Sequence, residues 1–235
     1  MTTQVQAADP AAGLLAGAAS VLAVVAHPDD ESFGLGGVLE RLAAGGAATA
    51  VLCFTHGEAS TLHGLDRDLG TVRPAEFAAA TRVLGIERAE LLAYPDGALG
   101  RVPVADLAGH VTRLARQVRP THLLAFDTGG ITGHPDHTSA TAAALAAAGL
   151  LGIPVLIWAL PAAVADALNS EFGTSFAGRP PAELTELAVD RARQWDAIAC
   201  HASQSGDNPV LRRRLELLGG SEHLLLAPAP AAPAR

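Results

Sequence analysis

Apolar runs alternate with helical patterns along this chain. The first run, residues 21–26, is continuously apolar, which is typical of a strand buried on both faces. The apolar residues between Leu35 and Leu42 then recur at the spacing of one helical face, and Gly45 and Gly46 end that pattern. A strand followed by a helix in this way predicts a parallel βαβ unit.

The same alternation continues along the chain. A second helix is predicted to start with Thr71 as its N-cap, to keep Pro74 in its first turn and to end at Gly85. A third helix is stopped by Pro120, and an alanine-rich helix begins near Asp136. Strands are predicted over residues 48–55, 89–93, 121–126 and 154–158; after these, residues 185–189 fit a strand or a helix, 191–201 a helix and 222–226 a short strand.

These elements predict one α/β domain over residues 20–226, a doubly wound, mostly parallel, Rossmann-like sheet with helices on both faces. Residues 1–19 and 227–235 are predicted to be flexible tails. The chain has 235 residues, of which 49% are hydrophobic, so it is long enough for one such domain with its own core.

Composition disfavours nucleic acids and membranes as partners. The formal net charge is -8, the only basic run is residues 212–214, and aromatic residues make up 4% of the chain. No stretch approaches the roughly 18 large apolar residues of a membrane helix, and the N-terminus lacks the basic region of a secretory signal. Cys53 and Cys200 are predicted to be small buried hydrophobes rather than a disulfide. A cytoplasmic protein is therefore expected.

Two clusters of imidazole and carboxylate groups follow predicted strands. Residues 27–31 (His-Pro-Asp-Asp-Glu) come directly after the first strand, and residues 134–137 (His-Pro-Asp-His) follow the fourth beyond a glycine-rich loop. Ligands of doubly wound sheets bind beyond the carboxyl ends of the strands, so both clusters are expected at one edge. Capping or surface roles would explain either cluster alone, but two clusters at this edge indicate a site.

Two imidazoles and a carboxylate with an open coordination position make a catalytic zinc site. Within each cluster a spacing of three residues lets two side chains converge from one helical turn. We assign His27, Asp30 and His137 as the metal ligands. Asp29 and His134 then remain for proton transfer and charge stabilisation beside a bound water, whose pKa zinc lowers to about 7.

At these residues the sequence resembles the LmbE-like (PIG-L) zinc deacetylases, which include enzymes of the mycothiol, bacillithiol and glycosylphosphatidylinositol pathways. The resemblance spans about residues 20–226. It implies a hydrolase that removes an N-acyl group from an amino-sugar-containing substrate, and the acyl group expected is N-acetyl. The implied cofactor is Zn²⁺, with Fe²⁺ as the alternative. The supporting motifs are Thr55-His56-Gly57-Glu58, Arg73 with Glu76, Tyr94-Pro95-Asp96-Gly97 and His201-Ala202-Ser203-Gln204.

The resemblance also implies roles for the catalytic residues. It gives the same three metal ligands and makes Asp29 the general base. His134 would be the acid or the group that stabilises the oxyanion, oriented by Asp136.

Three further residues would bind substrate by the same resemblance. Arg73 and Asp96 would grip its hydroxyls, and His201 would lie near the pocket. Each also has a local explanation: Arg73 could pair with Glu76 in the first helical turn, Asp96 could be a turn residue, and His201 could cap a helix end.

Other functions are also considered. Mycothiol-type members carry tyrosine where this chain has Thr132, which argues against a mycothiol-precursor substrate; a thiol-conjugate amidase or an antibiotic-glycoside deacetylase would keep the same chemistry. A non-haem iron oxygenase also uses two histidines and a carboxylate, but on a different fold class. A nucleotide-binding module is disfavoured because Leu39 stands where the third fingerprint glycine belongs. The expected partner is a small amino sugar or glycoside, and the chain is compatible with a homo-oligomer.

Overall fold

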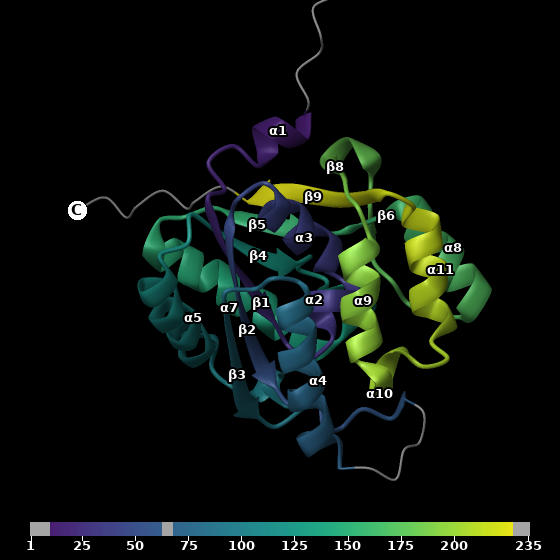
Figure 1. The fold of residues 1–235 in the computed structure, drawn as a ribbon, viewed down its shortest axis with the longest axis horizontal. Helices are drawn as coiled ribbons and strands as arrows, with labels where there is room; N and C mark the ends of the chain where they lie inside the picture. The colour runs from purple at the N-terminus through teal and green to yellow at the C-terminus, as the bar shows by residue number, and fades with distance from the viewer. Residues whose placement is uncertain (1–9, 63–67, 228–235) are drawn as a thin grey trace, which may run out of the picture.

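The structure, a computed structural model, describes residues 10–62 and 68–227 and is built on a seven-stranded sheet (Figure 1). The strand order is β3-β2-β1-β4-β5-β9-β8. The first five strands are parallel, while β9 is antiparallel to both β5 and β8. The strands are β1 (Ser20–Val25), β2 (Ala48–Thr55), β3 (Arg88–Tyr94), β4 (His122–Phe126), β5 (Val155–Trp158), β8 (Thr185–Ala188) and β9 (Ser221–Ala227), and β6 (Leu160–Pro161) pairs with β7 (Gly178–Arg179).

Helices cover both faces of this sheet, as the sequence predicts. The helices are α1 (Pro10–Leu14), α2 (Asp30–Phe33), α3 (Gly36–Ala44), α4 (Leu69–Val83), α5 (Val104–Val118), α6 (Gly130–Gly133), α7 (Pro135–Leu151), α8 (Ala162–Phe172), α9 (Ala192–Cys200), α10 (Ala202–Ser205) and α11 (Pro209–Leu218), with 3₁₀ turns at Leu99–Arg101 and Pro181–Glu183. Helices α5 and α7 pack on one face, and α3, α4 and α9 lie over the other (Figure 1).

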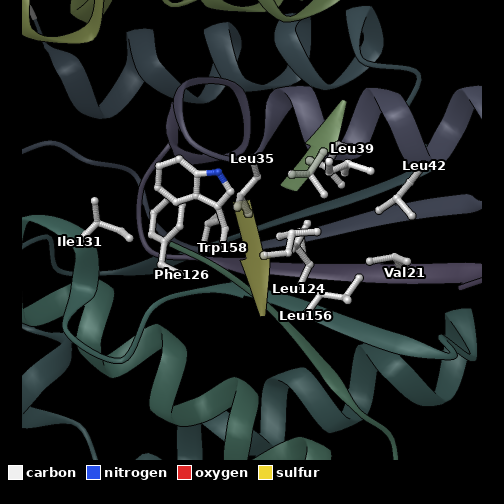
Figure 2. Packing of buried hydrophobic residues seen from close by; sticks show 14 of the residues in the cluster. Val21, Leu35, Leu39, Leu42, Leu124, Phe126, Ile131, Leu156 and Trp158 are labelled. Carbon is white, nitrogen blue, oxygen red and sulfur yellow. The ribbon is translucent and has the colours of Figure 1, made fainter. Parts of the chain in front are cut away.

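The continuous apolar character of β1 follows from its position between these layers. Val21 and Val25 belong to the core beneath α3, whereas Leu22 and Val24 belong to the core beneath α5 and α7. Successive side chains of a strand point to opposite faces, so a strand covered on both sides needs apolar residues throughout. Figure 2 shows the first of these cores, where leucines of α3 face Val21 and Trp158 lies beside Phe126.

The order of the strands fixes where a ligand can bind. From β1 the chain crosses to β2 on one side, and β4 pairs with β1 on the other side. The connections therefore diverge at the carboxyl ends of β1 and β4, which leaves a crevice at that edge. The two clusters of imidazole and carboxylate groups follow these strands, the first directly after β1 and the second after the glycine-rich loop that follows β4.

The structure differs from the sequence prediction at the start of α4 and in the N-terminal stretch. Helix α4 begins at Leu69, and its N-cap is Asp68 rather than Thr71. The Asp68 carbonyl accepts the N–H groups of Thr71 and Val72, and its carboxylate accepts the Thr71 hydroxyl. Of the two elements that the sequence allows for residues 185–189, the structure forms a strand, β8. Residues 10–14 form helix α1 within the stretch predicted as a tail, and Ala11 packs against the core. None of the described helices is long and apolar enough to cross a membrane.

Candidate metal centre and active site

The turn after β1 places the first cluster. The Asp30 carboxylate accepts hydrogen bonds from the backbone N–H groups of Ala26 and His27, at 3.1 and 2.9 Å, and so ties the start of α2 to the end of β1. Asp29 precedes α2 with φ at 119°, a conformation that is unfavourable for any residue except glycine. The hydrogen bonds of Asp30 help to maintain this strained turn. Strained backbone conformations are concentrated at functional sites.

His27, Asp30 and His137 converge on one point, although they come from two different loops. The His27 Nδ1 lies 3.1 Å from His137 Nε2, and the same His137 nitrogen lies 3.1 Å from Asp30 Oδ1. The ligand atoms of all three residues lie within 4.8 Å of one another. His27 and Asp30 are buried, and His137 is partly exposed.

The chemistry of these donors fits a divalent cation. His137 Nδ1 donates to the carbonyl of Gly130 at 3.0 Å, which leaves the lone pair of Nε2 facing the other two groups. Two imidazole nitrogens and a carboxylate that face one another at such distances attract a positive charge between them. Two imidazoles and a carboxylate are also the ligand set of catalytic zinc sites.

The pKa values of His27 and Asp30 are shifted in the directions expected where positive charge is favoured. Burial lowers the pKa of His27, but the nearby carboxylates of Asp136, Asp96 and Asp30 outweigh it and raise the pKa to about 10. Burial raises the pKa of Asp30, but His137 and His27 outweigh it and hold the pKa well below its usual range. Three carboxylates around one imidazole make this the part of the cavity best suited to a cation.

A second group of metal-type ligands shares His27. This group consists of His27, His134 and Asp136, whose ligand atoms lie within 4.8 Å of one another. The His27 Nε2 lies 3.0 Å from Asp96 Oδ1 and 3.5 Å from Asp136 Oδ2. Both oxygens of the Asp136 carboxylate are engaged, because they accept hydrogen bonds from the N–H groups of Gly97 and Leu99 at 2.8 and 3.0 Å. In Asp30 both backbone hydrogen bonds end on Oδ2, which leaves Oδ1 facing His137. The group with Asp30 is therefore the better metal site.

Asp29 lies beside the cluster and is held by Arg73. Arg73 Nη2 lies 2.9 Å from Asp29 Oδ2, and the same guanidinium donates to the carbonyls of Pro28 and Gly57. Burial raises the pKa of Asp29 to about 6, against the opposing effect of the arginine. A carboxylate with a pKa near neutrality is well placed to accept a proton at physiological pH.

Gly57 makes this arrangement possible. It adopts φ of +66°, and a Cβ at this position would overlap the Arg73 guanidinium. Arg73 is only 3% exposed and does not pair with Glu76, which instead accepts from the N–H and hydroxyl of Ser203 at 2.8 and 2.6 Å. The alternative of a solvated charge in the first turn of α4 is therefore wrong.

His134 presents a nitrogen to the cavity in a defined tautomer. The N–H of Asp136 donates to His134 Nδ1 at 3.2 Å, so Nδ1 is the acceptor and Nε2 carries the proton of the neutral ring. Asp136 thus orients His134 through its backbone and not through its carboxylate. Burial, followed by the charges of His27 and His137, lowers the pKa of His134. His134 is therefore a neutral donor at physiological pH.

His201 lies near the cavity, with its ring against that of Phe33, but it does not line the cavity itself. It is fully buried, and its Nε2 lies 2.7 Å from Glu31 Oε1. The other oxygen of Glu31 accepts from the backbone N–H of Asp29 at 3.0 Å. Sequence reasoning missed this support of the strained Asp29 turn, and the only signal for it is the acidic residue that follows the two aspartates.

A cavity of about 540 Å³ opens over these groups, a size suited to a small-molecule ligand. Asp96 lines it, and its Oδ2 accepts from the N–H of Ala59 at 2.9 Å, so Asp96 is more than a turn residue. The opposite wall includes Trp158 and Arg214. The predicted residues at the cavity are His27, Asp29, Asp30, Arg73, Asp96, His134 and His137.

Comparison with known sequences points to one family. A family model described as "PIG-L: GlcNAc-PI de-N-acetylase" matches residues 22–148. The chain is 34% identical over 241 residues to a 1D-myo-inositol 2-acetamido-2-deoxy-alpha-D-glucopyranoside deacetylase of Salinispora arenicola, covering 81% of this chain and 78% of that protein. A protein of the same name from Streptomyces scabiei is 36% identical over 159 residues, which cover 57% of this chain and 49% of the relative. The chain thus matches about half the length of the Streptomyces protein.

Comparison of structures points to the same fold. The zinc-inhibited form of the teicoplanin deacetylase Orf2 superposes with a TM-score of 0.70 at 21% sequence identity. The match covers 90% of this chain and 99% of the other. The doubly wound arrangement of strands and helices is therefore shared along nearly the whole domain.

Proposed function

The chain belongs to the PIG-L family of de-N-acetylases, and from that premise we propose that it hydrolyses the N-acyl amide of an amino-sugar-containing substrate. N-acetyl is the first acyl group to consider, because the relatives named above are deacetylases of an acetamido sugar linked to inositol. The observation that carries the proposal is the convergence of His27, Asp30 and His137 in a cavity that Asp29 also lines.

We assign Zn²⁺ to the group formed by His27, Asp30 and His137, with Fe²⁺ as the alternative metal. The donor types and the Gly130 carbonyl behind His137 support this assignment. When bound, the ion would acidify a water molecule and polarise the amide carbonyl. An iron oxygenase gains no support, because the chain has an α/β fold and family relatives that are deacetylases.

Asp29 is assigned as the general base. It would accept the proton of the water that attacks the amide carbon, and the Arg73 guanidinium keeps its carboxylate oriented. With a pKa of about 6, most of Asp29 is ionised at neutral pH. The same carboxyl group can return the proton to the amine nitrogen as the carbon–nitrogen bond breaks, which yields the free amine and the carboxylic acid.

His134 is assigned to the oxyanion. Its Nε2–H can donate a hydrogen bond to the carbonyl oxygen as negative charge develops there, and a neutral ring suffices for this role. Asp96 is the candidate for a substrate hydroxyl, since its carboxylate faces the cavity. Arg73 acts on Asp29 rather than on substrate, because its Nη1 and Nη2 groups bind Asp29 and two backbone carbonyls and its remaining donor, Nε, is buried.

The proposal is tested by metal analysis of the purified protein together with acetate release from a panel of N-acetylglucosaminyl glycosides, including the inositol glycoside. We expect one equivalent of zinc or iron per chain and acetate release that chelation abolishes and zinc restores. The panel should contain glycosides with other aglycones, because Thr132 and the wall near Trp158 can alter substrate preference. Metal binding without amide hydrolysis on any member would contradict the proposal.

A further inference from the structure

One cation on the cavity wall has no carboxylate partner among the described residues. Two arginines line the cavity, and Arg73 is already bound to Asp29. The other, Arg214 on α11, donates from Nη2 to the carbonyl of Phe33 at 2.7 Å, and its Nε is buried without a hydrogen-bond partner. A guanidinium has five N–H groups, so most of the hydrogen-bonding capacity of this half-buried arginine is uncommitted.

The fold holds Arg214 firmly against the cavity. Its guanidinium carbon lies 5.6 Å from the centre of the Trp158 ring, within range of a cation–π contact. The Trp158 indole N–H donates to Glu222 at 2.7 Å, which fixes the ring that supports the arginine. Leu211 and Leu215 bury the inner face of α11, which fixes the backbone that carries Arg214.

Two other polar side chains of the C-terminal segment, Asn208 and Gln204, line the cavity with Arg214 and are already hydrogen-bonded. Asn208 accepts from the N–H of Leu211 at 3.0 Å and caps α11. Gln204 accepts from the Ser60 hydroxyl at 2.7 Å. Neither side chain carries a charge. The carboxylate with the largest electrostatic effect on Arg214 is that of Glu222, but it forms its ion pair with Arg191 and not with Arg214. A ligand carboxylate would therefore give Arg214 a direct partner.

Arg214 lies on the opposite side of the metal centre from Asp96. Asp96 follows β3, whereas Trp158 ends β5, and the strands that carry His27 and precede His137 lie between them in the sheet. A sugar whose hydroxyls contact Asp96 and whose amide lies at the metal centre would extend its remaining part towards Arg214.

We propose that Arg214 forms an anion subsite that binds a carboxylate carried by the substrate, on the part of the molecule remote from Asp96. The inference rests on the proposed function only in taking the ligand to be a substrate. A single planar guanidinium matches one carboxylate in a bidentate contact. A dianion would meet stronger repulsion from Asp29 and Asp30, which line the same cavity. The carboxylate can belong to the aglycone or to the acyl group.

The test uses two matched pairs of ligands that lack the scissile amide, so no turnover occurs. The first pair is para-carboxyphenyl and para-carbamoylphenyl glucosaminide, with the charge on the aglycone. The second is N-carboxypropyl and N-carbamoylpropyl glucosamine, with the charge in the position of an acyl chain. Binding to the metal-loaded protein is measured by calorimetry and, in a Trp195→Phe background, by the fluorescence of Trp158.

We expect one carboxylate to bind at least about tenfold more tightly than its carbamoyl partner. This ratio should fall to near one in Arg214→Gln and be partly kept in Arg214→Lys. Arg213→Gln is the matched control: it removes the same charge one residue away, where Arg213 pairs with exposed Glu171, and it should keep the ratio. The pair that shows the preference identifies the source of the carboxylate.

Two results would overturn the subsite. One is the absence of a preference for the carboxylate in both pairs with the wild-type protein, and the other is a preference that persists in Arg214→Gln. Because the readout is binding without turnover, a failure of the subsite is distinguishable from a failure of amide hydrolysis, which the acetate-release panel measures separately.

Discussion

The two walls of the cavity differ in how their charges are satisfied. On the wall built from the loops after β1 and β4, each charged group has close partners: Asp30 with His137, Asp29 with Arg73, and Asp136 with two backbone N–H groups. On the wall built from β5 and α11, Arg214 has one backbone carbonyl and an aromatic face. The charged groups of the first wall therefore have protein partners without a ligand, whereas Arg214 on the second wall would gain its carboxylate partner from the substrate.

We infer from this difference that the first wall carries out the reaction and the second wall determines which substrate binds. The residues of the first wall lie within the segment that the family model matches, 22–148, and Trp158 and Arg214 lie beyond it. We therefore expect changes in the first wall to alter metal content and kcat. Changes in the second should alter affinity and leave the metal in place.

The largest effect is expected from His137→Ala. Removing one of three protein ligands should lower metal affinity by more than about 100-fold and reduce acetate release to background. Metal content after dialysis and activity at saturating zinc measure the two effects. His110→Ala is the control, since His110 contacts Tyr94 outside the cavity. A variant that keeps full metal content would remove His137 from the ligand set.

Asp29→Asn should separate the base from the metal site. The amide cannot accept the water proton, so kcat should fall by roughly 10²–10⁴-fold while metal content stays normal. Asp166→Asn changes the same charge on the exposed side of α8 and should leave kcat unchanged. Near-normal turnover in Asp29→Asn would show that another group takes the proton.

A smaller effect is expected on the pH profile. Because Asp29 must be ionised to accept a proton, kcat/KM should rise as pH increases through about 6. The Arg73 charge lowers the pKa of Asp29, so Arg73→Met should move this rise to higher pH, whereas Arg73→Lys should move it less. Profiles that coincide for all three proteins would contradict control of Asp29 by Arg73.

The smallest effect is expected from Trp158→Phe. This change removes the hydrogen bond to Glu222, which should cost about 1–3 kcal/mol of folding free energy, and it loosens the platform beneath Arg214. KM should rise a few-fold while metal content and kcat stay close to wild type. Urea unfolding and steady-state kinetics measure these quantities. A loss of metal in Trp158→Phe would contradict the inference that the two walls have separate roles.

Much of the fold can be predicted from the sequence because its signals are local. Strands buried on both faces appear as continuous apolar runs, and the predicted limits of β2 and β4 fall within one residue of the observed ones. The family was also predicted correctly from the two His-rich motifs. The start of α4 was misplaced because Asp68 and Thr71 are both good capping residues, and the structure uses both in one hydrogen bond.

The candidate site could be predicted only where its members lie in short motifs. His27 and Asp30 are neighbours in the chain, and strand order brings His137 to them. By contrast, the contact of Glu31 with His201 joins residues 170 positions apart, and that of Phe33 with Arg214 joins residues 181 apart. Such pairings depend on how α9 and α11 pack, and no periodicity in the sequence reports that packing.

Gly57 shows that the reaction can depend on a residue with no functional group of its own. A Cβ there would overlap the guanidinium and displace it from Asp29, so we expect Gly57→Ala to lower kcat although every reactive group remains in the sequence. Inactive variants recovered from random mutagenesis would then include this position. An inventory restricted to acids, bases and ligands would class those variants as folding defects.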